Sequence, residues 1–333
     1  MNLDRTKLWV VATMACFLWA SAAHGQTTPK MKMTTDIPET ISTPDSVETN
    51  RLGTLEFVDG FPTDDTTQKV YDNLDFMRGV EAFLNALPGA SVEAARVGFA
   101  SQGASDNQTV LMMENLMDSK SLFLTPNTES VYSMMWLDTK QGQLVLETPP
   151  NVLGVIDDHW FQYVGDVGNA GPDRGKGGKF LLLPPGYTGK VPEGYHVFRS
   201  PTFGNLFFWR GFLDNGSTTT AVNNTKQFTK VYRLSEAENP PKMKFINVSG
   251  KAFNTIHAND FHFYEEVNDI VQYEPNEAFH SETLGLLAAI GIEKGKPFAP
   301  DARMKTILTE SVAVGNATAR AIIFRTRMKE AYD

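Results

Sequence analysis

The stretch LVLETPPNVLGVIDDHWFQYVGDVGNAGPDRGKGGKFLLL, residues 144–183, decides the fold, because short apolar runs alternate in it with turn-forming residues. The runs at 144–146, 155–164 and 180–183 are rich in branched and aromatic side chains, and Pro, Gly and Asp separate them. Short runs of this kind between turn signals predict strands. Several of them in succession favour an antiparallel β-sandwich within an α+β fold.

The same pattern continues on both sides of this stretch. Further strands are predicted at residues 131–136, 195–198 and 206–212, where β-branched and aromatic residues recur. The glycine-rich segment 169–179 predicts a mobile loop between two strands.

Helical periodicity flanks the predicted strands. The first helix is expected to begin at Thr63 or Asp64, either of which can cap it. It is expected to end at Pro88-Gly89, since proline and glycine interrupt helices. A second, short helix is predicted over residues 91–97. Apolar residues at three- and four-residue steps predict three more helices, over residues 260–271, 281–292 and 302–324.

The first 25 residues have the order of an export signal. A charged lead precedes an apolar run over residues 8–20, and small residues follow it. The run is shorter than the roughly 20 residues that cross a bilayer. We therefore predict cleavage after Gly25 or Ala23 and a periplasmic or secreted protein.

The rest of the chain divides into three predicted regions. Residues 26–50 are rich in Thr, Pro, Ser and charge, which predicts a flexible leader. Residues 51–215 are expected to form the β-sandwich domain with its leading helices, and residues 216–333 a mainly helical region.

Composition excludes several classes of function. The formal net charge is −9 and no basic block occurs, so nucleic acid is a poor partner. The single cysteine, Cys16, lies in the predicted signal, so no disulfide, thiolate metal site or cysteine nucleophile is expected in the exported chain. No membrane span is expected after signal removal.

One polar run interrupts the predicted strands. Asp157, Asp158 and His159 place two carboxylates beside an imidazole, which is a combination used in acid–base catalysis. The alternative is a polar strand end or bulge. These three residues are the candidate catalytic residues.

Two histidines are candidate metal ligands. His257 and His262 flank the start of a predicted helix, but a spacing of five residues places them on different helix faces, which disfavours a helical two-histidine site. The metal role therefore depends on folding that brings other ligands near.

Four residues are candidate ligand-binding residues. Asn127 precedes a strand and is expected either to fix its loop or to point into a pocket. Tyr132, Trp136 and Trp160 lie in strands, where aromatic side chains form the core or a platform for a sugar or an aromatic ligand.

Several long runs resemble a known bacterial family. TPNTESVYSMMWLD, the stretch ETPPNVLGVIDDHWFQYVGDVGNAGPDRGKGGKFLLLPPGY, GKAFNTIHANDFHFYEE and LGLLAAIGIEKGKPFAPDARMK are similar to domain of unknown function 1254. The resemblance covers roughly residues 50–333, and it implies a jelly-roll-like β domain with helical segments behind it. It also implies a following domain of unknown function 1214, which is expected to begin where this sequence stops, at Asp333, so that the sequence is either a fragment or has lost that domain. It supplies no catalytic residues.

Three functions stay open from the sequence. No Gly-x-Ser-x-Gly or His-Glu-x-x-His motif occurs, which favours a non-catalytic β-sandwich that binds a small molecule, an envelope ligand or a partner. The second is an exported hydrolase or lyase that uses the Asp/His site, with or without a metal. The third is a cell-envelope structural or assembly protein, for which a homo-oligomer is expected. The cofactor is unknown.

Overall fold

The computed structural model describes residues 35–123 and 126–327, and the chain divides into two compact units, residues 1–67 and 68–333. The predicted signal and the first part of the predicted leader lie outside the described residues. In the first unit, η1 (Glu39–Ile41) precedes an antiparallel sheet of β1 (Ser46–Thr49), β2 (Gly53–Val58) and β3 (Phe61–Pro62). Strand β1 lies inside the predicted leader, and such a short polar strand has no apolar period to reveal it.

A 38-residue helix, α2 (Asp64–Ser101), begins at the predicted cap and continues through Pro88. The predicted stop at Pro88-Gly89 is therefore wrong. Apolar residues on both sides of the proline, such as Phe83 and Phe99, are fully buried in two different cores. This burial outweighs the helix penalty of one proline, which is about 3 kcal/mol.

The second unit contains two larger sheets. The six-stranded sheet has the order β13 (Lys244–Asn247), β4 (Thr109–Met112), β5 (Ser130–Asp138), β11 (Gly204–Phe212), β7 (Val152–Asp158) and β8 (Tyr163–Gly168). The four-stranded sheet has the order β10 (His196–Arg199), β9 (Lys179–Leu183), β6 (Leu144–Glu147) and β12 (Lys230–Arg233). The pairs β13–β4 and β10–β9 are parallel, so the sheets are mixed rather than wholly antiparallel as predicted.

These two sheets share one apolar core. Met135 and Trp209 from the six-stranded sheet cluster with Leu146 and Phe180 from the four-stranded sheet. Helix α3 (Thr219–Phe228) adds Val222 to the same core. The predicted α+β class is confirmed, whereas the jelly-roll arrangement stays a prediction.

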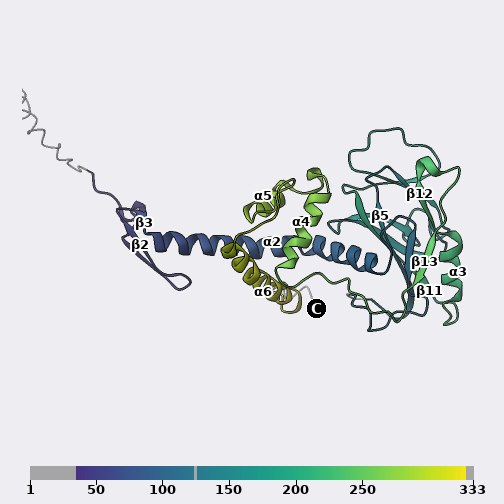
Figure 1. The fold of residues 1–333 in the computed structure, drawn as a ribbon, viewed down its shortest axis with the longest axis horizontal. Helices are drawn as coiled ribbons and strands as arrows, with labels where there is room; N and C mark the ends of the chain where they lie inside the picture. Colours follow the sequence, from purple (N-terminus) through teal and green to yellow (C-terminus); the bar gives the residue numbers. More distant parts are fainter. Residues whose placement is uncertain (1–34, 124–125, 328–333) are drawn as a thin grey trace, which may run out of the picture. The chain divides into compact units, whose positions relative to one another are not determined.

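Helix α2, the long helix of Figure 1, contributes side chains to two further cores. Its C-terminal half packs Val92 and Phe99 against the outer face of the six-stranded sheet, where they meet Met134 of β5. Its middle packs against α4 (His262–Tyr273), α5 (Ser281–Ala289) and α6 (Ala302–Phe324), the three helices that the sequence predicts near the C-terminus.

Helix α6 has one property that the sequence analysis did not expect. Its 23 residues are long and apolar enough, by length and composition alone, to cross a membrane. One such helix is weak support for a span, because core helices pass the same test. Leu308 and Val312 of α6 are fully buried in the helical core, which accounts for part of its apolar character.

The helix glycines provide a test of this packing. A Cβ atom on Gly89 would lie 2.5 Å from the indole of Trp160, whereas a Cβ on Gly285 of α5 would meet nothing within 4 Å. We expect Gly89→Ala to lower the free energy of unfolding by about 1–3 kcal/mol despite the better helix propensity of alanine. Gly285→Ala should raise it by up to about 1 kcal/mol. Urea denaturation measures both, and equal effects of the two substitutions would contradict the packing.

Candidate functional site

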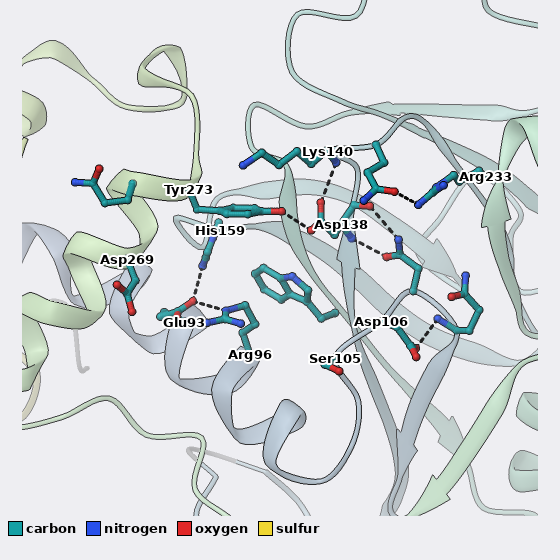
Figure 2. Close-up of a pocket in the computed structure, with 15 residues that line it drawn as sticks. Glu93, Arg96, Ser105, Asp106, Asp138, Lys140, His159, Arg233, Asp269 and Tyr273 are labelled. Carbon is teal, nitrogen blue, oxygen red and sulfur yellow. Dashed lines mark hydrogen bonds and ion pairs between the residues drawn. The ribbon is translucent and has the colours of Figure 1, made fainter. Parts of the chain in front are cut away.

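A cavity of about 580 Å³ lies where the helices meet the six-stranded sheet (Figure 2). Its walls come from five parts of the chain: α2, residues 105–108, the end of β5 with the turn after it, β12, and α4. The rim is polar and exposed, and the floor is formed by Trp136 and the buried residues around His159. The cavity thus combines a mouth open to solvent with a buried base.

His159 forms the centre of that base. Its Nε2 lies 3.0 Å from Oε2 of Glu93 in α2, and its Nδ1 lies 2.8 Å from Oε1 of Glu274, the residue after α4. All three side chains are at most 2% exposed. His159 itself directly follows β7, so one side chain joins the sheet to two helices.

The hydrogen bonds extend beyond these three residues. Arg96 Nε donates to Oε2 of Glu93 at 2.7 Å, one helical turn along α2. At the other end, the backbone N–H groups of Phe203 and Gly204 donate to Glu274 at 2.6 and 2.9 Å. We call Arg96, Glu93, His159 and Glu274 the Arg96–Glu274 network. Its formal charge is zero when His159 is protonated.

Gly204 allows two side chains to approach its backbone. A Cβ atom there would lie 2.2 Å from the Trp136 indole and 3.0 Å from Oε1 of Glu274. The first distance is shorter than any ordinary contact, so only glycine leaves room for the indole. The edge of the Trp136 indole also meets the His159 ring, with ring centroids 4.8 Å apart.

The network shifts the proton affinities of its members. Burial favours neutral His159, but the hydrogen bonds to Glu274 and Glu93 outweigh burial and raise the pKa of His159. Burial works in the opposite direction on Glu93, and the bonds to Arg96 and His159 outweigh it and lower the pKa of Glu93. The raised pKa favours the imidazolium form of His159, in which both ring nitrogens donate to the two carboxylates.

The rim has its own hydrogen bonds. Asp138 accepts from the Tyr273 hydroxyl and from the backbone N–H of Lys140, the latter at 2.8 Å. The Lys140 ammonium lies 3.9 Å from the centroid of the Tyr273 ring. Arg233 donates to Gln141. Figure 2 shows these side chains around the cavity.

Only one of the three candidate catalytic residues, His159, lines the cavity. The buried Asp158 accepts from the backbone N–H groups of Trp160 and Gln162, at 2.8 Å each, and so holds the turn after β7. Asp157 is half-buried outside the cavity, where burial and the charges of Asp158 and Asp166 raise its pKa to about 6.

The four candidate ligand-binding residues lie in different places. Trp136 lines the cavity. Tyr132 of β5 is buried in the core that the sheet forms with α2. Its hydroxyl accepts a hydrogen bond from the Asn127 backbone N–H at 3.0 Å. The Asn127 side chain holds its own loop by accepting from Glu129 and Ser130. Trp160 packs in the helical core.

The two candidate metal ligands do not meet each other or His159. The His257 ring contacts Phe83, ten residues and thus about 15 Å along α2 from Glu93. His262 is exposed and bonds Asp260 at 2.9 Å. Within residues 35–123 and 126–327, no group of three or more His, Cys, Asp or Glu side chains is arranged to hold a metal ion.

Sequence reasoning missed the two carboxylates that bind His159. Glu93 and Glu274 are 66 and 115 residues from it along the chain. The one local signal was at Glu93, a charged residue within the apolar run SVEAARV of a predicted helix. Glu274 carried no such signal. It follows the end of a predicted helix, and a surface position for an acidic residue there would be ordinary.

The network predicts a pH window for stability. Because the pKa of His159 is raised on folding, its contribution to the free energy of unfolding is complete below pH 6.5, its ordinary pKa. This contribution is lost as the pH rises through the pKa of the folded state. The lowered pKa of Glu93 makes its contribution complete above the ordinary value of 4.5, and this is lost as pH falls. We expect the wild-type free energy of unfolding to decline above about pH 6.5.

His159→Gln should remove most of that alkaline decline, and His280→Gln, at an exposed histidine, should preserve it. Urea titrations at several pH values measure both slopes. Equal slopes in the wild type and His159→Gln would contradict the charged state of His159.

A second substitution tests the buried ion pair. Glu274→Gln removes the charge that faces His159, so we expect the free energy of unfolding to fall by about 3–5 kcal/mol, the range for breaking a buried pair. Glu277→Gln, three residues further and exposed, should stay within about 0.5 kcal/mol of the wild type. Chemical denaturation at pH 6 measures the difference, and similar values for both variants would contradict the pair.

Comparison with known proteins identifies the central segment. A search of curated proteins gives no match. The chain is similar to the crystal structure of the VPA0106 protein from Vibrio parahaemolyticus, with a TM-score of 0.52 and 16% identity, over 74% of this chain and 59% of that chain. At this identity the likeness supports the fold alone. The family model "Protein of unknown function (DUF1254)" matches residues 107–233. This match confirms the family resemblance over residues 107–233, whereas the wider extent of roughly residues 50–333 stays a prediction.

Proposed function

We propose that this chain is an exported binding protein that takes a small organic ligand into the cavity above the Arg96–Glu274 network and releases it unchanged. The observation that carries the proposal is that both ring nitrogens of His159 are hydrogen-bonded to carboxylates. A general base needs an available nitrogen within reach of the substrate proton. The volume of about 580 Å³ is within the usual range for small-molecule sites.

The cavity walls are held in place before any ligand arrives. Asn107 donates to the backbone carbonyl of Asp138 at 3.0 Å and accepts from its N–H at 2.7 Å. Asp138 in turn fixes the Tyr273 hydroxyl. Walls that are ordered by their own hydrogen bonds reduce the entropy cost of binding. This preorganisation supports a ligand site.

Export is part of the proposal and rests on the signal predicted in residues 1–25. It places the ligand in the periplasm or outside the cell. Cell fractionation followed by N-terminal sequencing tests it, with a first residue of Gln26 or His24 expected. A chain retained in the cytoplasm with its first 25 residues intact would contradict export.

The two other functions from the sequence lead to different measurements. A hydrolase or lyase would transform a bound compound, and mass spectrometry after incubation detects this. A jelly-roll assembly protein of the envelope would form a homo-oligomer, and sedimentation of the full chain detects that.

Ligand binding is tested with a panel of sugars, lipids, amines and aromatic acids in a thermal-shift assay. We expect at least one class to raise the melting temperature of the wild type, because a ligand that binds only the folded state stabilises it. Ser105→Trp should abolish the shift, since the indole would occupy the cavity mouth. Ser119→Trp, at an exposed serine outside the cavity, should preserve it.

Two outcomes would contradict the proposal. One is that no compound of the panel stabilises the wild type. The other is that a compound binds equally well to Ser105→Trp, which would place its site elsewhere.

A further inference from the structure

We infer that the ligand of this cavity is a small aromatic carboxylic acid, whose carboxylate is held by Arg96 and Lys140. This inference rests on the proposed function and names its ligand class. It follows from which polar groups of the cavity already have partners and which do not.

Three of the four carboxylates that line the cavity, those of Asp138, Glu93 and Asp106, have hydrogen-bond partners within the protein. Both oxygens of Asp138 accept hydrogen bonds, from Lys140 N–H and the Tyr273 hydroxyl. Glu93 binds Arg96 and His159. Asp106 accepts from the Gln108 backbone at 3.0 Å. These three acceptors serve the protein itself, and the fourth carboxylate, that of Asp269, faces the charge of Arg96.

Several donors of the cavity are still available. Arg96 uses Nε and one terminal nitrogen on Glu93, and within the described residues its other terminal nitrogen has no hydrogen-bond partner. The Lys140 ammonium has contacts only with aromatic rings among those residues, at 3.9 Å from the centroid of Tyr273 and 5.5 Å from that of Phe203. A planar guanidinium and an ammonium are each suited to bind a carboxylate.

The indole of Trp136 adds a third donor. Its Nε1–H has no hydrogen-bond partner in the part of the chain that the structure describes, and the residue lines the cavity. An N–H donor on an aromatic wall suits a ligand with an acceptor at one end and an apolar body. Tyr273 supplies a second aromatic wall.

Lys140 is poised to change partners. An exposed ammonium over a ring face gains little from that contact, whereas a hydrogen-bonded ion pair in a partly enclosed site gains more. We therefore expect Lys140 to leave the Tyr273 ring when a carboxylate enters, which frees that ring to contact the body of the acid.

One acidic residue competes with the ligand. Asp269 of α4 lines the cavity and interacts electrostatically with Arg96. Removing its charge leaves Arg96 more available to a bound carboxylate. Asp269→Asn should therefore strengthen the binding of an acid by a fewfold, a change opposite in sign to the loss expected from a damaged fold.

Matched acid and amide pairs test the inference. The probes are benzoate, phenylacetate and 4-hydroxybenzoate, each with its primary amide, titrated calorimetrically into the full exported chain. We expect at least one acid to bind at least about tenfold more tightly than its amide, the effect of a charged hydrogen bond. Lys140→Met should weaken that acid by about tenfold and leave the amide unchanged, while Lys120→Met, an exposed lysine outside the cavity, should change neither.

The outcomes separate this inference from the proposed function. Amides or other neutral compounds that bind as tightly as the acids would overturn the carboxylate inference and leave the binding function standing. An unchanged acid affinity in both Lys140→Met and Asp269→Asn would also overturn it. A panel without any binding compound would overturn both.

Discussion

The fold depends on one buried imidazolium held between two carboxylates. His159 lies after a strand of the six-stranded sheet, Glu93 on the long helix and Glu274 at the end of a helix near the C-terminus. A buried charge is costly unless it is paired and hydrogen-bonded, and here each partner is itself satisfied by Arg96 or by backbone N–H groups. The arrangement adds directional contacts between three elements that also meet through apolar packing.

The same interaction divides the cavity residues into those that hold the structure in place and those that are available to a ligand. With both ring nitrogens of His159 committed, His159 and its two carboxylates serve as a rigid support at the base of the cavity, and the available donors belong to Arg96, Lys140 and Trp136 around it. Networks that are fully satisfied specify one geometry, whereas partly satisfied ones are costly. A ligand-binding site benefits from this rigidity, because an ordered wall reduces the entropy cost of binding.

The strands and helices were predictable from local pattern, whereas the site was not. Runs such as residues 180–183 and 206–212 form strands because their apolar side chains enter the core between the sheets. Short strands such as β12 and β13 were missed, since four mixed residues carry little period. At the site, the sequence singled out His159 but supplied its two neighbouring aspartates as partners. The glutamates that bind it come from remote segments, and only the folded chain brings them together.

Helix α2 contributes side chains to the core beneath the six-stranded sheet and to the helical core behind it. Because one helix contributes to both cores, their unfolding is coupled. Neither core can open without exposing part of that helix. Amide hydrogens in its middle and C-terminal half should then exchange only through global opening of residues 68–333. Pro88, in the C-terminal half of this helix, therefore lies within one cooperative unit and does not mark a hinge between two.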